Sequence, residues 1–235
     1  MLTRPAQSRI TGGMTGTTTT SGQSATQILL VRHGHVENPE DVLYGRLPGF
    51  RLSDRGVEQA RCAAVFLGSV RLAALFSSPL LRCCQTAREI LRLQPQLSLR
   101  LSRRIIEVRS AYEGCPARII DRRRGDIYTG IPEGFEQPGD IVRRTKRFLR
   151  SIRRRYPGGT VAAVTHGDVI AFTVLWAQGF ALTPANKLRL AQAGIADGYP
   201  AHASVTRLAY LTDSPDERPR VCYMPLPARD SVVTG

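Results

Sequence analysis

Short apolar runs alternate with amphipathic stretches along most of this chain of 235 residues. The first run, Ile28 to Val31, predicts a buried strand over 27–32, because the apolar residues end abruptly on a charged one. Similar runs predict further strands at 73–77, 97–101, 160–165, 204–210 and 220–224. Helical patterns lie between them, over about 53–69, 78–93, 139–155 and 168–179, with a short helix near Pro184. This alternation predicts a three-layer α/β fold with a mostly parallel central sheet and helices on both faces.

Local signals define several of these elements more closely. Ser53 is the expected N-cap of the first helix, and Ser78 followed by Pro79 predicts the N-cap and first position of the second. The helix over 139–155 has an apolar stripe on one side and arginines on the other. The stripe consists of Ile141, Val142, Thr145, Phe148, Leu149 and Ile152. By contrast, 102–138 is irregular and contains a turn-prone run of arginines.

Composition divides the chain into three parts. Residues 1–26 are rich in Thr, Gly and Ser and contain no acid, so we expect a disordered leader that buries too little surface to offset chain entropy. A targeting segment is the alternative that its arginines leave open. Residues 27–225 are expected to form one folded domain, followed by a polar tail at 226–235. No stretch approaches the ~18 uninterrupted apolar residues that a membrane span needs.

Arginine dominates the net charge of +14, since Lys146 and Lys187 are the only lysines. A basic surface gains affinity for nucleic acid by releasing counterions. Here, however, the arginines are scattered along the whole chain without interleaved aromatic residues, so we expect a solvated surface and no nucleic-acid partner. The five cysteines lack metal-ligand spacing, which favours free thiols and a cytoplasmic location.

Two histidine-glycine pairs stand where predicted strands end. Arg32-His33-Gly34 follows the first strand, and His166-Gly167 follows the strand at 160–165. Ligands of such sheets bind outside the carboxyl ends of the strands, so both imidazoles are expected at one edge. Because an imidazole can act as a nucleophile and an arginine can hold a phosphate, this pattern predicts phosphoryl chemistry on histidine.

Four segments share their order and separation with one known family. They are Leu30-Val31-Arg32-His33-Gly34, Leu52-Ser53-Asp54-Arg55-Gly56 with Gln59-Ala60, Ser77-Ser78-Pro79-Leu80-Leu81-Arg82 with Gln85-Thr86-Ala87, and Val164-Thr165-His166-Gly167. Together they resemble the histidine phosphatase superfamily, which includes the cofactor-dependent phosphoglycerate mutases, over about 28–210. The resemblance implies a phosphoglycerate mutase-like fold and a reaction through a phosphohistidine.

The resemblance also implies roles for single residues. His33 would be the nucleophile, Arg32 and Arg82 would clamp the phosphate, and His166 would stabilise charge on the transferring phosphoryl group. Histidine attacks phosphorus as neutral imidazole, so its other ring nitrogen needs an acceptor, expected to be a backbone carbonyl. Guanidinium forks match phosphate oxygens. Gly34, which has no Cβ, is expected to let the backbone approach the phosphate.

An acid is required as well, to protonate the leaving oxygen and then to activate water. Ile106-Glu107-Val108 and Tyr112-Glu113-Gly114 resemble the segment that carries the family's glutamate, which points to Glu107. Glu113 stays an alternative, because the spacing is one residue shorter than the common pattern. His35 and Asn38 are further candidates at the rim of the site.

The loop after Gly34 departs from the family pattern. Val36 stands where a hydroxyl residue is usual, Pro39 stands where an asparagine is usual, and the segment 44–50 is one residue longer. This loop contacts substrate in the family, so the substrate stays undetermined. The longer substrate-covering motifs of the mutases are missing, which favours a phosphatase. The stretch 115–138, with several arginines, is expected to form a cap that recognises an acidic substrate.

The resulting hypothesis is a phosphoric monoester hydrolase of the histidine acid phosphatase type that acts on a small phosphorylated metabolite. Mutase-type phosphoryl transfer, and a catalytically inactive basic module that binds phosphate or nucleic acid, are the alternatives. No cofactor, metal or membrane contact is expected, since arginines and histidines supply the charge stabilisation. The sequence leaves open whether the chain forms a homodimer.

Overall fold

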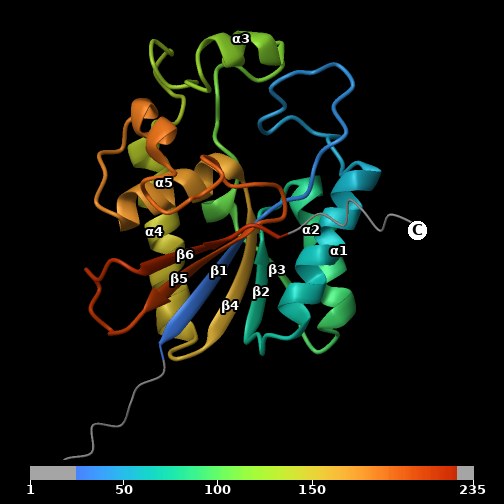
Figure 1. The fold of residues 1–235 in the computed structure, drawn as a ribbon, viewed down its shortest axis with the longest axis vertical. Coiled ribbons are helices and arrows are strands. Elements are labelled where there is room, and N and C mark those ends of the chain that lie inside the picture. The colour runs from blue at the N-terminus through green and yellow to red at the C-terminus, as the bar shows by residue number, and fades with distance from the viewer. Residues whose placement is uncertain (1–24, 227–235) are drawn as a thin grey trace, which may run out of the picture.

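A six-stranded sheet forms the centre of the protein, which the computed structural model describes over residues 25–226. The strands are β1 (Thr26–Arg32), β2 (Ala74–Ser77), β3 (Leu99–Leu101), β4 (Thr160–Thr165), β5 (Val205–Tyr210) and β6 (Arg220–Met224). They lie in the order β3-β2-β4-β1-β5-β6 (Figure 1). Each predicted strand is present. The strands β1, β2 and β4 are mainly buried apolar runs, whereas the edge strands β3 and β6 are half-buried or exposed.

Parallel pairing in the middle of the sheet sets the position of the two histidine-glycine pairs. β3, β2, β4 and β1 run parallel to one another, whereas β5 and β6 add antiparallel pairs at one edge. The mostly parallel sheet is therefore confirmed. Arg32 of β1 is the register partner of Thr165 of β4, so His33 and His166 leave the sheet at the same level.

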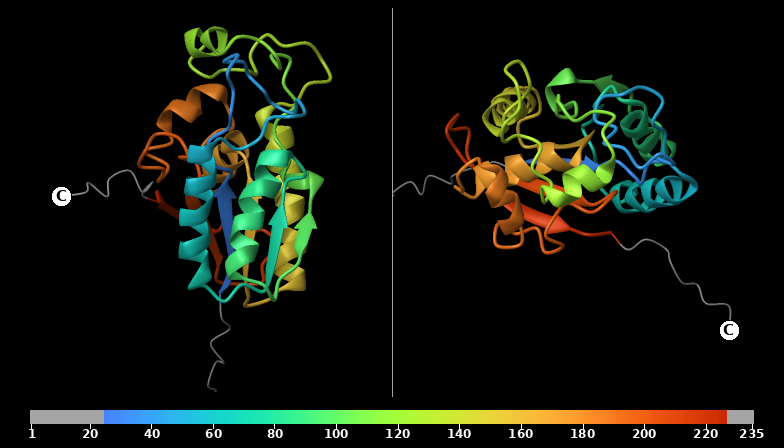
Figure 2. Two further views of the ribbon diagram at one scale, coloured as in Figure 1. Left: turned by 90° about the vertical axis from the view of Figure 1, so that its right-hand side faces the viewer. Right: turned by 90° about the horizontal axis from the view of Figure 1, so that it is seen from above.

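Helices cover both faces of the sheet, as the alternating pattern predicts (Figure 2). They are α1 (Asp54–Gly68), α2 (Leu81–Leu93), α4 (Pro138–Arg155) and α5 (Gly167–Ala177). Leu29 and Val31 of β1 share a buried core with α1 and α2. Ile28 and Leu30 point to the opposite face, where they share a second core with α4 and α5. Alternate side chains of one strand thus join both layers.

α4 and the start of α1 form as their local sequences predict. The six residues of the apolar stripe of α4 are all buried, and Arg143, Arg147, Arg150 and Arg154 on its other side are exposed. The Ser53 hydroxyl caps α1 by accepting a hydrogen bond from a backbone N–H in the first turn. Periodicity and capping therefore suffice to define these two elements.

The start of α2 differs from the prediction. The helix begins at Leu81, and Leu80 is its N-cap without a side-chain hydrogen bond. The predicted cap, Ser78, instead places its Oγ 2.7 Å from Nε2 of His166. A tertiary contact has taken the hydroxyl that would otherwise cap the helix, so the assignment of Ser78 and Pro79 to its start is wrong.

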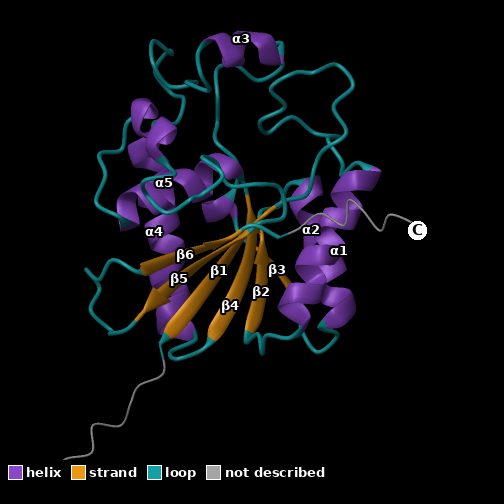
Figure 3. Cartoon of the chain, viewed as in Figure 1, coloured by secondary structure: helices purple, strands orange, loops and turns teal. Residues whose placement is uncertain are grey.

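Loops and short helices stand above the carboxyl ends of the strands (Figure 3). The irregular stretch contains the 3-10 turn η1 (Arg103–Ile105) and the short helix α3 (Ala117–Arg122). The predicted helix near Pro184 is a 3-10 helix, η2 (Pro184–Arg189). We call residues 110–130 the cap, because α3 and its flanking loops lie over the end of the sheet where the two histidines emerge.

The predicted leader and polar tail lie almost entirely outside the described residues, although Thr26 already belongs to β1. All five cysteines are free thiols. Among the helices within 25–226, none is long and apolar enough to cross a membrane.

Candidate active site

His33 and His166 stand next to each other where β1 and β4 end. The backbone N–H of His33 donates to the carbonyl of Thr165 at 3.1 Å, which extends the pairing of the two strands by one residue. The two imidazole ring centres lie 5.3 Å apart, and both side chains are buried. The structure thus brings the two imidazoles together at one sheet edge, as the sequence predicts.

The imidazole of His33 is held in one tautomer. Its Nδ1 lies 2.8 Å from the carbonyl oxygen of Gly34, which can only accept, so Nδ1 carries the proton and Nε2 keeps its lone pair. Burial lowers the pKa of His33 well below its usual value, and the charges of Arg82 and Arg32 lower it further. His33 is therefore a neutral imidazole in which Nε2 is the atom with the nucleophilic lone pair.

Arg82 reaches the centre of the site from the first turn of α2. Its Nε donates to Nε2 of His33 at 3.2 Å, and a terminal nitrogen donates to the carbonyl of Gly45 at 2.7 Å. The same terminal nitrogen lies 3.6 Å from the carboxylate of Glu107. The ring of Tyr44 covers the guanidinium at 4.7 Å. A completely buried cation is therefore fixed in one orientation beside the nucleophile.

Arg32 contributes a second guanidinium from the end of β1. One terminal nitrogen donates to the carbonyl of Pro200 at 2.6 Å, and the ring of Tyr199 lies 5.2 Å from the guanidinium carbon. Its Nε is buried and has no hydrogen-bond partner among residues 25–226. A buried donor without an acceptor is costly, so Arg32 offers a binding position for an anion.

Glu107 and His166 form a hydrogen-bonded pair. The Oε2 of Glu107 lies 3.2 Å from Nδ1 of His166, and since a carboxylate only accepts, Nδ1 donates and Nε2 accepts from Ser78. Burial lowers the pKa of His166 to about 4. Burial opposes ionisation of Glu107, but His166 and Arg82 outweigh it and hold its pKa well below the usual range. At neutral pH the pair is a carboxylate facing a neutral imidazole.

Gly34 is required by a backbone contact, and its approach to phosphate stays a prediction. A Cβ on Gly34 would overlap the carbonyl oxygen of Gly56, and a Cβ on Gly56 would overlap that of His35. The N–H of Gly34 donates to Thr86 Oγ1 at 3.2 Å. The backbone around Gly34 therefore packs directly against the N-terminal turn of α1, and glycine is needed for that contact.

The two candidate acids occupy different places. The carboxylate of Glu107 lies among the histidines and Arg82, and its Oε1 accepts from the N–H of Val108 at 2.9 Å. Glu113 instead accepts from the backbone N–H of Arg46 at 2.9 Å and does not line the cavity described below. The geometry therefore favours Glu107 as the acid, because the Glu113 side chain is hydrogen-bonded to a loop backbone.

The other two candidates at the rim, His35 and Asn38, also form hydrogen bonds that hold loops in place. Nδ1 of His35 lies 2.8 Å from the Oγ of Ser53. The side-chain amide of Asn38 donates to the carbonyl of Val42 at 2.9 Å and accepts from its N–H at 3.2 Å. Val36 is buried in the core, so a hydroxyl at this position would not face the site. These residues shape the loop without lining the cavity.

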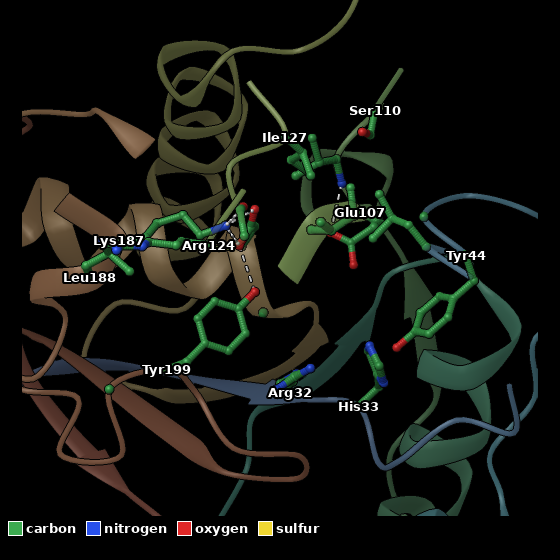
Figure 4. A pocket seen from close by; sticks show the side chains of 18 residues that line it. Arg32, His33, Tyr44, Glu107, Ser110, Arg124, Ile127, Lys187, Leu188 and Tyr199 are labelled. Atoms are coloured by element: carbon green, nitrogen blue, oxygen red, sulfur yellow. Dashed lines mark hydrogen bonds and ion pairs between the residues drawn. The ribbon is translucent and has the colours of Figure 1, made fainter. Parts of the chain in front are cut away.

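A cavity of about 490 Å³ begins at Arg32, His33 and Glu107 and extends to Arg124, Lys187 and Tyr199 (Figure 4). We call one part of the site the buried end, which consists of Arg32, His33, Arg82, Glu107 and His166. We call the opposite part the cap end, which consists of Arg124, Asp168, Lys187, Leu188 and Tyr199. The two ends differ in origin. The termini of β1, β4 and α2 supply four of the five residues of the first, whereas the start of α5, the 3-10 helix η2 and two loops supply the second.

Asp168 organises the cap end. Its carboxylate accepts hydrogen bonds from the hydroxyls of Tyr128 and Tyr199, at 2.7 Å for Tyr199. Nζ of Lys187 lies 2.8 Å from the same carboxylate and also donates to the carbonyl of Gly125 at 3.0 Å. One buried carboxylate thus connects α5 to the cap, to η2 and to the loop of Tyr199.

The sequence did not indicate Tyr44, Ser78 or Asp168 as site residues. Tyr44 belongs to the loop segment that departs from the family pattern, which marks the region without revealing contact with Arg82. Ser78 and Asp168 act through partners far away in the chain. For Asp168, the one signal in the sequence is its position directly after His166-Gly167.

Three side chains have the spacing of a metal site. Ligand atoms of His33, Glu107 and His166 lie within 4.8 Å of one another. The guanidinium of Arg82 stands among the same atoms, 3.2 Å from Nε2 of His33 and 3.6 Å from the Glu107 carboxylate. Because this fixed cation repels a metal ion and attracts an anion, the arrangement suits a phosphate better than a metal.

Several known proteins are similar to this chain. An uncharacterized protein of Mycobacterium tuberculosis is 42% identical over 89 residues, which cover 38% of this chain and 44% of that protein. The chain thus spans less than half the length of that relative. Phosphoserine phosphatase 1 of Hydrogenobacter thermophilus is 31% identical over 153 residues, covering 60% of this chain and 70% of that protein.

The fold has close counterparts among solved structures. A mycobacterial glucosyl-3-phosphoglycerate phosphatase superposes with a TM-score of 0.69 at 24% identity, covering 85% of this chain and 98% of that chain. At this identity the likeness concerns the fold. The sequence itself matches the family model described as histidine phosphatase superfamily (branch 1) over residues 28–206. That match includes both histidine-glycine pairs, Arg32, Arg82 and Glu107, and the chain therefore belongs to the histidine phosphatase superfamily.

Proposed function

We propose that this protein is a phosphomonoesterase that hydrolyses a small phosphorylated metabolite through a phosphohistidine on His33. One observation carries the proposal: the neutral His33 keeps a lone pair on Nε2 beside the buried Arg82, the partly buried Arg32 and a histidine–glutamate pair. The family membership and the phosphatase names of two similar proteins support it.

In the first step the lone pair of His33 Nε2 forms a bond to phosphorus, and the bond from phosphorus to the leaving oxygen breaks. Arg32 and Arg82 hold the phosphoryl oxygens, whose charge is spread by bidentate contacts. The Nδ1–H of His166, which donates to Glu107 in the structure, also donates to a phosphoryl oxygen in this step. Glu107 supplies the proton that the leaving oxygen takes up.

Glu107 must gain a proton before it can act as an acid. A substrate dianion next to Arg82 offsets the positive charge that holds the pKa of Glu107 low, so binding raises that pKa. In the second step the carboxylate takes a proton from water, the water oxygen bonds to phosphorus, and the bond to His33 breaks. Because His33 stays neutral in acid and Glu107 needs protons, the site suits the acid phosphatase type.

The test is to trap the phosphoenzyme during a turnover screen of sugar phosphates, phosphoglycerates, nucleotides and phosphopeptides. Wild type should yield an alkali-stable phosphoryl group on His33, and His33→Ala should yield none and lose turnover. EDTA should leave turnover unchanged, since Arg82 occupies the centre of the potential metal site. Full activity of His33→Ala would overturn the mechanism.

Two other outcomes would replace the proposal. Isomerisation of a phosphoglycerate, stimulated by a bisphosphate primer, would show mutase-type transfer. Salt-dependent retention on nucleic acid without turnover of p-nitrophenyl phosphate would show an inactive binding module.

A further inference from the structure

The walls of the cavity beyond the buried end are largely apolar. Ile120, Ile127 and Leu188 line it together with the rings of Tyr44 and Tyr199. A leaving group rich in hydroxyls would lose its hydration here without gaining matching partners. The walls therefore suit a leaving group with an apolar or flat body.

The charged groups of the cap end are already paired, with one exception. Asp168 is saturated by Lys187 and by two tyrosine hydroxyls, so neither Asp168 nor Lys187 brings an uncompensated charge. Arg124 lines the same cavity, yet its guanidinium makes no hydrogen bond or ion pair with any residue between 25 and 226. Figure 4 shows Arg124 beside Lys187, on the side of the cavity away from His33.

The neighbouring arginine shows what a structural role looks like in this segment. Nε of Arg123 donates to the carbonyl of Asp126 at 2.8 Å, and a terminal nitrogen donates to that of Thr129 at 2.6 Å. Its guanidinium also lies 5.1 Å from the ring of Tyr112. The side chain of Arg123 thus closes the turn that follows α3, whereas the side chain of Arg124 makes no hydrogen bond there.

The backbone holds Arg124 in a conformation that side chains rarely adopt. Its φ is +52°, in the left-handed region that favours glycine. The turn is fixed by the N–H of Arg124, which donates to Asp121 at 2.8 Å, and by the N–H of Gly125, which donates to Ile120 at 2.9 Å. Lys187 anchors the same turn to the body of the protein. The two backbone bonds end α3 in the left-handed turn with which many helices end, so the turn holds Arg124 in a defined place at the cavity.

We infer that the leaving group of the substrate carries a second anionic group, which Arg124 binds at the cap end. The substrate class is a phosphomonoester with a carboxylate or a second phosphate at the far end of an apolar or flat spacer. This inference rests on the proposed hydrolysis at His33. It adds which leaving groups the enzyme selects. The phosphate is held by Arg32 and Arg82, and Arg124 selects what is attached to it.

The experiment compares leaving groups that differ in one charge. 4-Carboxyphenyl phosphate is compared with 4-carbamoylphenyl phosphate, whose distal group has a similar size and no charge. In 1,4-phenylene bisphosphate the distal group is a second phosphate. Biphenyl versions of these compounds lengthen the spacer. For wild type we expect kcat/KM to favour an anionic member about tenfold over its neutral partner, at one spacer length or both, as a charge-assisted contact at a partly open site provides.

Three variants assign the preference to one side chain. Arg124→Ala should reduce the ratio to within about twofold, and Arg124→Lys should retain part of it, because the charge stays while the fork is lost. Arg122→Ala is the matched control: Arg122 ends α3, is exposed and does not line the cavity, so the ratio should persist.

The outcomes separate the two proposals. Phosphohistidine formation and turnover without any preference for the anionic members would overturn the inference and leave the hydrolysis standing. Equal loss of preference in Arg124→Ala and Arg122→Ala would overturn the assignment to Arg124. Absence of both turnover and phosphohistidine with every compound would remove the proposed function, and the inference with it.

Discussion

The two ends of the cavity are built by opposite means. At the buried end, His33, Arg82 and His166 are each at most 1% exposed, and they stand on the termini of β1, α2 and β4. At the cap end, Arg124 is exposed and belongs to a turn after the short helix α3. Rigid elements hold groups to within the tolerance that chemistry needs, whereas loops vary without disturbing the core. Under the two proposals above, the reaction and its selectivity are thus set by different parts of the fold.

Glu107→Gln tests the buried end most severely. An amide keeps the shape of Glu107 but cannot carry the proton, so we expect kcat with an alkyl phosphate to fall about a thousandfold. The loss should be smaller with p-nitrophenyl phosphate, whose leaving group departs without a proton. Glu113→Gln is the matched control, because its side chain contacts a loop backbone. A greater loss in the Glu113 variant would move the acid to that residue.

Arg82→Lys should show that charge alone does not suffice at the buried end. An ammonium keeps the charge but cannot contact His33, Gly45 and an anion with one rigid fork. We expect kcat/KM to fall about a hundredfold, as for the loss of one preorganised donor. Arg88→Lys, at an exposed position of the same helix, serves as the control in parallel assays and thermal melts. If both variants retain wild-type rates, the described geometry is irrelevant to turnover.

Asp168→Asn addresses the cap end. Loss of the carboxylate charge frees Lys187 and weakens the hydrogen bonds of Tyr128 and Tyr199, so the wall facing the leaving group loosens. We expect KM to rise about tenfold while kcat changes less than threefold, because the reacting groups stay in place. Asp121→Asn, an exposed exchange on α3, should alter neither constant. A fall in kcat larger than the rise in KM would show that Asp168 serves the buried end.

The smallest expected effect concerns pH. All four histidines have pKa values below their usual value of about 6.5, and that of His33 lies well below it because of burial and Arg82. Because of this lowered pKa, a change of pH from 7.5 to 6 should not protonate His33. The imidazole then stays in its neutral, reactive form. For a histidine with an unshifted pKa, the fraction of neutral imidazole would fall about fourfold over this range. ¹⁵N NMR of the imidazoles measures this directly, and a His33 midpoint near 6.5 would contradict it.

Sequence reasoning succeeds in this protein where a feature depends on nearby residues. The strands and the apolar stripe of α4 follow from runs and periods within a few turns, and the pairing of His33 with His166 follows from parallel strand ends. The short helix α3 escapes prediction because none of its residues is buried, so it leaves no periodic signal.

Features that depend on distant partners are missed or left open. The Ser78 hydroxyl binds His166 instead of capping α2, and Asp168 draws its importance from Lys187 and two tyrosines. The choice between Glu107 and Glu113 needs the path of the loop between them, which spacing does not determine. Sequence therefore identifies the buried end almost completely and the cap end hardly at all.

The contact between Gly34 and Gly56 bears on how product leaves the site. Two backbones touch there without any side chain that could rotate aside, so the segment bearing His33 moves together with α1. The opposite wall is held by side-chain hydrogen bonds of Asp168 and Lys187, and side chains can rotate where packed backbones cannot. For the proposed hydrolysis we therefore expect inorganic phosphate and the released alcohol to leave past the cap, with that opening limiting turnover whenever the chemical step is fast.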